Sequence, residues 1–202
     1  MRKRLIAMAA AVLACSSVML AAAPESETAD ELSLLPTPKE FQLQGGRFRV
    51  GPKTRILVQL GHQEEDRIAA ETLAEEVADE AGLTLHIIGT KVSSRAEGGA
   101  IMLVRLQDQR VRRFLERKGL AADASVGQEG YLLFSDHSHL IVAANSGRGL
   151  FSGVQTLRQL LRPDGKKLFC PAVMIRDWPN FQTPASNVSR ESAPEFGKGP
   201  ES

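Results

Sequence analysis

The sequence is poor in cysteine and in aromatic residues, and it has almost no net charge. Its 202 residues include two cysteines, one tryptophan and one tyrosine, and 25 Lys and Arg residues nearly balance 24 Asp and Glu residues. A net charge of +1 provides no global field that would attract nucleic acid or an anionic membrane. One Trp and one Tyr also leave little aromatic surface for stacking on the bases of single strands. We therefore expect no nucleic-acid partner.

The amino terminus has the three-part pattern of a secretory signal peptide, which we assign to residues 1–23. Three basic residues precede an apolar run, and small residues follow it. Two alternatives stay open. The sequence VLAC resembles a bacterial lipoprotein box, with cleavage before Cys15 and lipidation of its thiol, and the apolar stretch approaches the roughly 20 residues that an uncleaved anchor needs. We expect an exported protein that is located in the periplasm, attached to the outer membrane as a lipoprotein, or secreted. A lipid anchor would be its only contact with a membrane.

Cysteine usage excludes an intramolecular disulfide in the mature domain. Cys15 lies in the segment that is removed or lipidated, so that only Cys170 remains. Cys170 lies in the apolar run KLFCPAVMI with no base nearby in the sequence. We interpret it as a buried small hydrophobic residue.

Apolar periodicity predicts short strands and two main helices. Helical spacing places Ile68, Leu73, Val77 and Ala81 on one stripe of a helix over 63–81. A second apolar stripe predicts another helix, which Asn145 or Ser146 caps and which ends at Pro163 and Gly165. The residues on its inner face are Leu150, Phe151, Val154, Leu157, Leu160 and Leu161.

Alternation and turn residues predict the strands. Strands over 41–43 and 48–50 flank a turn at Gly45 and Gly46, and further strands follow at 56–60, in LTLHIIG and in AIMLVRL. A shorter basic helix over 108–119 has Val111, Phe114 and Leu115 on its inner face. The sequence EGYLLFSDHSHLIVAAN predicts a hairpin, and KLFCPAVMI predicts the last strand.

These elements indicate an α+β fold, with a mostly antiparallel sheet and the two main helices on one of its faces, as a two-layer sandwich. The domain is expected over 32–181. Residues 24–31 form a linker, and residues 182–202, rich in Pro, Ser, Glu and Gly, predict a disordered tail.

Three stretches of the chain together resemble a known family. They are LLPTPKEFQLQGGRFRV, EGYLLFSDHSHLIVAANSGRGLFSGVQTLRQLL and PAVMIRDWPNF. Over about 150 residues they are similar to the accessory domain that precedes the catalytic barrel in bacterial β-N-acetylhexosaminidases of glycoside hydrolase family 20. The strand at Glu129-Gly130-Tyr131 and the helical stretches Gly149–Gly153 and Gln155–Leu160 carry the most specific part of the resemblance.

The resemblance implies a domain without its own catalytic residues. In this family the segment similar to IRDWPNF leads into the first barrel strand, and the acidic pair that orients the acetamido group and protonates the leaving oxygen lies on barrel loops. Here Phe181 is followed by QTPASNVS, and a barrel needs about 250 residues. We expect an accessory domain whose barrel is missing, with no catalytic, cofactor or metal residue, and with Trp178 and Phe181 at the barrel-docking surface.

Three other residue groups have simpler interpretations than a functional site. The helix at 63–81 carries eight acidic residues and one Arg, which include Glu64-Glu65-Asp66, and a solvated polar face explains them. The segment from Arg105 to Lys118 is basic, and it could face those acids, a partner or water.

In DHSH, His137 and His139 point to one strand face and could form half of a zinc site with His62 and His86. A polar hairpin turn is the simpler explanation of DHSH, and we prefer it.

Two functions follow as hypotheses. One is a non-catalytic domain of an exported β-N-acetylhexosaminidase-like enzyme, which braces the catalytic barrel and is inactive alone. The alternative is a stand-alone exported module that binds an amino-sugar polymer or a glycosidase subunit. A hydrolase with a metal at DHSH is a third and more remote possibility.

Overall fold

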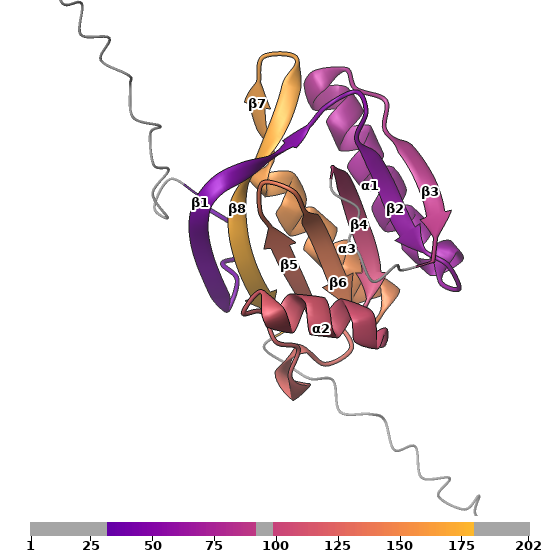
Figure 1. Ribbon diagram of the computed structural model, residues 1–202, viewed down its shortest axis with the longest axis vertical. Coiled ribbons are helices and arrows are strands. Elements are labelled where there is room, and N and C mark those ends of the chain that lie inside the picture. The colour runs from indigo at the N-terminus through magenta and orange to yellow at the C-terminus, as the bar shows by residue number, and fades with distance from the viewer. Residues whose placement is uncertain (1–31, 92–98, 180–202) are drawn as a thin grey trace, which may run out of the picture.

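A mixed sheet of eight strands organises residues 32–91 and 99–179, the part of the chain that the computed structural model describes (Figure 1). Its strand order is β1-β8-β5-β6-β4-β2-β3, and β7 pairs with β8 outside this path. The strands are β1 (Glu40–Val50), β2 (Arg55–Gln59), β3 (His86–Thr90), β4 (Ala100–Arg105), β5 (Tyr131–Ser135), β6 (Leu140–Ala144), β7 (Arg162–Asp164) and β8 (Lys167–Asp177).

The α+β class is confirmed, and the sheet divides into an antiparallel half and a parallel half. The pairs β1–β8, β5–β8, β5–β6 and β7–β8 are antiparallel, which includes the predicted hairpin. The pairs β2–β3, β2–β4 and β4–β6 are parallel. The sequence pattern did not reveal this parallel half. It arises because α1 (Gln63–Ala81) connects β2 to β3 and returns the chain to the same end of the sheet.

The two main helices lie side by side on one face of the sheet, as expected (Figure 1). They are α1 and α3 (Gly147–Leu160), and the larger core fills the space between them and the sheet. A short helix α2 (Gln109–Arg117) covers part of the opposite face, where Val111 and Leu115 pack into a second, smaller core. A one-turn helix, η2 (Ala124–Val126), follows α2. None of the described helices combines the length and the apolar character that a membrane crossing requires.

β1 is one long strand, which corrects the prediction of two strands around a turn. Gly45 and Gly46 lie inside it, and the pairing with β8 shifts register between Leu43 and Arg47. Gly46 has a φ of 105°, a conformation that glycine adopts without steric cost. The glycine pair therefore forms a bulge and not a turn, because the 11-residue strand β8 is long enough to pair with both halves of β1.

The buried stripe of α1 differs from the predicted one. Ile68, expected inside, is 60% exposed, whereas Ala69, Ala70, Leu73 and Val77 are buried. Asp66 continues this buried stripe one turn earlier.

Asp66 is fully buried, so that its interpretation as part of a solvated surface is wrong. Its two carboxylate oxygens accept hydrogen bonds from Arg105, at 2.6 Å from Nη2 and 3.1 Å from Nε. Burial raises the pKa of Asp66, and the Arg105 guanidinium opposes that rise. Arg105 also bonds the exposed Glu65 and the main-chain oxygen of Asn145. The two charged segments of the sequence thus meet in one internal ion pair, which ties the N-terminal turn of α1 to the end of β4.

The second main helix follows its pattern closely. Ser146 caps α3, because its Oγ accepts the Gly149 N–H at 3.2 Å. Leu150, Val154, Leu157 and Leu160 are fully buried, and so is Cys170 on β8, as predicted. Phe151 was expected to widen the buried stripe, but it is 36% exposed.

Candidate functional site

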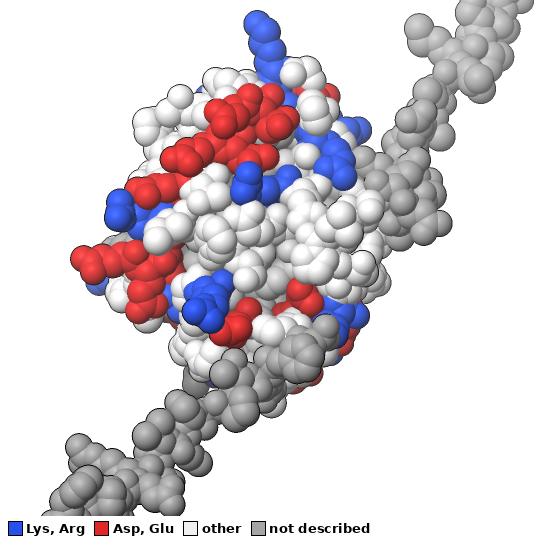
Figure 2. All heavy atoms as spheres, turned by 180° about the vertical axis from the view of Figure 1, so that it is seen from behind, with Lys and Arg blue, Asp and Glu red and all other residues white. Residues whose placement is uncertain are grey.

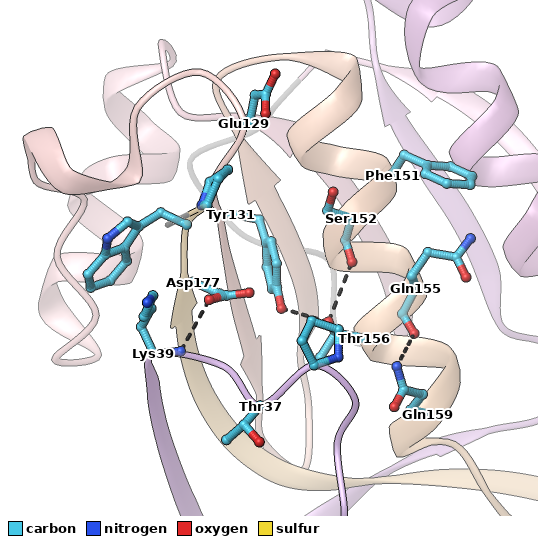
Figure 3. A pocket seen from close by; sticks show the side chains of 13 residues that line it. Thr37, Lys39, Glu129, Tyr131, Phe151, Ser152, Gln155, Thr156, Gln159 and Asp177 are labelled. Carbon is cyan, nitrogen blue, oxygen red and sulfur yellow. Dashed lines mark hydrogen bonds between the residues drawn. The ribbon is translucent and has the colours of Figure 1, made fainter. Parts of the chain in front are cut away.

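A pocket of about 420 Å³ opens beside α3, next to the last described residues of the chain (Figure 3). Four segments that are distant in sequence line it: the approach to β1, the start of β5, the outer face of α3 and the end of β8. Its lining residues are Pro36, Thr37, Lys39, Glu129, Tyr131, Phe151, Ser152, Gln155, Thr156, Gln159, Asp177, Trp178 and Pro179.

Glycines bring α3 close enough to the sheet to form one wall of the pocket. A Cβ at Gly153 would lie 2.4 Å from Val142 Cγ1 and 3.0 Å from the Tyr131 ring. Because these neighbours belong to buried strands, only glycine fits between them. With the helix held there, Phe151, Gln155 and Gln159, spaced four residues apart, share the outward side.

The floor of the pocket is a hydrogen-bonded pair of hydroxyl groups. The Tyr131 hydroxyl lies 2.6 Å from Thr156 Oγ1, which in turn donates to the main-chain oxygen of Ser152 at 3.4 Å. Burial raises the pKa of the Tyr131 phenol, so that it stays protonated at neutral pH. This pair fixes the base of the pocket and presents no nucleophile to it.

The rim of the pocket consists of polar groups that already have partners. The Gln159 side chain accepts the Leu35 N–H at 2.8 Å and donates to the Leu35 oxygen at 2.9 Å, which clamps the N-terminal segment onto α3. The Asp177 carboxylate accepts the Lys39 N–H at 3.1 Å, and Glu129 pairs with Arg148 at 2.7 Å. The carboxylates of the pocket therefore serve the architecture of its walls.

The outward surface of the two main helices is apolar at several points. Gly147 on α3 lies beside Glu65 on α1, and Arg158 on α3 forms an ion pair with Glu76 on α1. The two contacts join residues with the same separation in sequence, so the helices run parallel. The same separation places the exposed Ile68 on α1 at the height of Leu150 and its neighbour Phe151 on α3.

We define the α3 face as the pocket together with Leu35, Ile68, Phe151 and Trp178. Figure 2 shows this side of the molecule, with a broad uncharged area beside a band of acidic side chains. Leu35 is 74% exposed, and Ile68 and Phe151 are also exposed. Exposed apolar side chains that gather on one side of a domain are typical of an interface.

Of the three candidate site residues Trp178, Phe181 and Cys15, the structure places Trp178 at this site. Trp178 lines the pocket and lies 5.7 Å from the Arg176 guanidinium carbon. Phe181 and Cys15 lie outside the described residues. The sequence interpretation missed the polar pair Gln155 and Gln159, although their spacing to each other and to Phe151 was a visible signal.

The DHSH turn is held together by its own hydrogen bonds. Asp136 accepts the N–H groups of Ser138 and His139 at 2.8 and 2.7 Å, contacts the His139 ring and pairs with Lys118 at 3.0 Å. Across residues 32–91 and 99–179, no group of three or more His, Cys, Asp or Glu side chains could hold a metal ion.

Comparisons with known proteins place the described domain in a family. The family model of glycosyl hydrolase family 20, domain 2, matches residues 31–178. Two relatives are each 27% identical. A beta-hexosaminidase of Porphyromonas gingivalis matches over 157 residues, 74% of this chain and 18% of the relative. A beta-hexosaminidase of Vibrio furnissii matches over 151 residues, 75% of this chain and 20% of the relative.

A solved structure matches as well. The GH20 beta-N-acetylhexosaminidase from Streptomyces coelicolor A3(2) is 28% identical, with a TM-score of 0.52, over 71% of this chain and 26% of that chain. The chain spans about a fifth of the length of the curated relatives that it matches.

Proposed function

Because the chain belongs to the family of glycosyl hydrolase family 20, domain 2, we propose that it is the non-catalytic accessory domain of an exported β-N-acetylhexosaminidase-like enzyme. In this proposal the α3 face packs against the catalytic barrel of that enzyme and braces it. The observation that carries the proposal is the position of this pocketed surface, with its exposed apolar side chains, beside Trp178, where β8 has just ended.

The physical argument rests on what covers exposed apolar side chains. Leu35, Ile68 and Phe151 expose apolar surface that gains free energy when a partner removes it from water. Interfaces between domains typically bury 600–1,500 Å². An open pocket on such a surface can receive a projecting side chain, which fixes the orientation of the partner.

Two measurements test this proposal. The full chain, incubated with a chromogenic N-acetyl-β-glucosaminide, is expected to give no turnover. When the chain is added to the P. gingivalis relative from which the matching segment has been removed, we expect the melting temperature of that protein to rise. Turnover by the purified chain alone, or no association with the shortened relative, would contradict the proposal.

A second candidate function is direct binding of an amino-sugar glycan in the pocket. The observation that favours it is the combination of Trp178 with hydrogen-bonding groups such as Gln155 and Ser152 around one opening. Trp178 is the single Trp of the chain, so that its fluorescence reports on the pocket. Saturable quenching by chitin oligosaccharides would favour this function; unchanged fluorescence would exclude it.

A further inference from the structure

A cationic surface lies at the end of β8 opposite Trp178. In the antiparallel register, Arg49 on β1 faces Phe169 on β8, so that both side chains lie on the same side of the sheet. Arg47 and Lys167, each two residues from one of these, share that side. Their in-between neighbours Phe48, Val50, Leu168 and Cys170 point to the opposite side and are buried.

We define the cationic patch as Arg47, Arg49, Lys166 and Lys167. Lys166 lies in the turn between β7 and β8, and the β1–β2 turn passes beside the Lys167 side chain. All four patch residues are exposed. Among the described residues, none of them forms an ion pair with an acidic side chain, even though Asp164 faces Lys167 across the β7–β8 ladder.

The composition of the patch narrows the class of ligand. Arg47 lies over the Phe169 ring, 4.8 Å from the ring centre, and so covers one face of the only aromatic ring that the register places there. The large apolar side chains that are exposed in the described part of the chain all lie elsewhere. A membrane surface favours apolar side chains that insert, and single-stranded nucleic acid favours open aromatic faces. The patch offers guanidinium and ammonium groups, which bind carboxylate or sulfate groups.

The patch remains accessible when the α3 face is covered. β8 is 11 residues long, so that its two ends are roughly 33 Å apart at about 3.3 Å per residue. Figure 1 shows the β7–β8 hairpin projecting at the end of the molecule opposite α2. A polymer bound there would not compete with a catalytic domain docked beside Trp178.

We propose that the cationic patch binds an anionic polysaccharide that contains amino sugars, and that it thereby holds such a substrate near the catalytic domain. The amino-sugar part of this inference rests on the proposed function. The anionic part rests on the patch alone. Arg47 and Arg49 leave the same side of β1 about 7 Å apart along the backbone. Several cations spaced along one strand edge suit charges that repeat along a polymer.

Fluorescence anisotropy with the full chain and labelled hyaluronan fragments, which carry carboxylates and amino sugars, tests the proposal. We expect binding at low ionic strength that weakens steeply with added salt. Neutral chitin oligosaccharides should not bind to the patch. The double variant R49Q/K167Q should weaken hyaluronan binding at least tenfold.

The matched control removes the same charge from another basic surface. R112Q/R113Q on α2 should change the affinity less than twofold, since these exposed residues lie on a different element. Equal losses in both double variants, no binding at low salt, an equal loss of neutral-oligosaccharide binding in R49Q/K167Q, or preferential binding to phosphatidylglycerol vesicles would each overturn the proposal. Association with the shortened relative is measured separately, so that failure of this inference is distinguishable from failure of the accessory-domain proposal.

Discussion

At the scale of single residues, Asp66 and Glu65 show that burial gives two neighbouring carboxylates different energetic roles, although both contact the same guanidinium group. Glu65 and Asp66 both bond Arg105, but the Glu65 side chain is 67% exposed and that of Asp66 is completely buried. Water screens the first pair and does not reach the second. The sequence shows only consecutive acids, so the difference depends on which side of α1 meets β4.

Asp66→Asn is therefore expected to destabilise the fold by about 3–5 kcal/mol, because it leaves the Arg105 guanidinium buried without a full counter-charge. Glu65→Gln, the matched control, should cost at most about 1 kcal/mol. Urea unfolding of the full chain measures both. The double variant Asp66→Leu/Arg105→Met should be more stable than Asp66→Asn, since it removes both charges. Equal losses in the two single variants would show that the pair is not buried in solution.

Asp136 predicts a dependence of stability on pH. Burial alone would raise its pKa, but hydrogen bonds from Lys118, the Ser138 and His139 N–H groups and the His139 ring hold the pKa below its usual range. A carboxyl with a lowered pKa in the folded state contributes stability above its unfolded pKa of about 3.9. That contribution is lost as the pH falls below about 4.

Asp136→Asn should lower the free energy of unfolding at pH 7 and flatten its decline between pH 5 and pH 2. Urea unfolding at several pH values measures this decline. Asp164→Asn, which changes an exposed carboxylate on the β7–β8 hairpin, should leave the slope unchanged. If the free energy of unfolding of Asp136→Asn declines with falling pH as steeply as that of the original chain, the turn does not hold this carboxylate as described.

At the scale of elements, local patterns predicted most helices and strands, and pairing over long distances caused the differences. The hairpin β5–β6, the helix α3 and the strand β8 follow from alternation, capping and apolar spacing. The bulge in β1 does not follow from a local pattern. The pair Gly45-Gly46 is typical of a turn, and it forms a bulge here because β8 pairs with the strand on both sides of it. The parallel pairs depend on how α1 crosses the sheet, which the sequence of a single strand does not encode.

Gly153 on α3 provides a test of helix-to-sheet packing. Alanine favours a helix over glycine by about 1 kcal/mol, but here its Cβ would collide with Val142 and Tyr131. We expect Gly153→Ala to destabilise the fold by about 1–3 kcal/mol net, since α3 must move away from the sheet. Ser152→Ala, at the preceding position of α3, controls for helix propensity and should be nearly neutral. A gain in stability for Gly153→Ala would contradict the close approach of α3.

At the scale of the whole molecule, the site could be predicted only in part. Trp178 was identified because it follows the last apolar strand, but the pocket joins it to Thr37 and Gln155, which lie more than 100 and more than 20 residues away in the chain. No local pattern reports such a meeting of segments. The exposure of Ile68 was equally hidden, because it depends on the ion pair that fixes the rotation of α1.

The α3 face should be dispensable for folding and necessary for docking. Ile68 is 60% exposed, so that Ile68→Gln removes apolar surface from the face and should change the free energy of unfolding by less than about 0.5 kcal/mol. Ile87→Gln is the matched control, because Ile87 is also exposed, at 40%, but lies on the edge strand β3 outside the α3 face. Isothermal titration of each variant with the shortened P. gingivalis relative is expected to show affinity at least fivefold weaker for Ile68→Gln and within twofold of the original chain for Ile87→Gln. If both variants bind as the original chain does, a different surface carries the contact; if both lose affinity equally, the loss reflects a general change in the domain and not the α3 face.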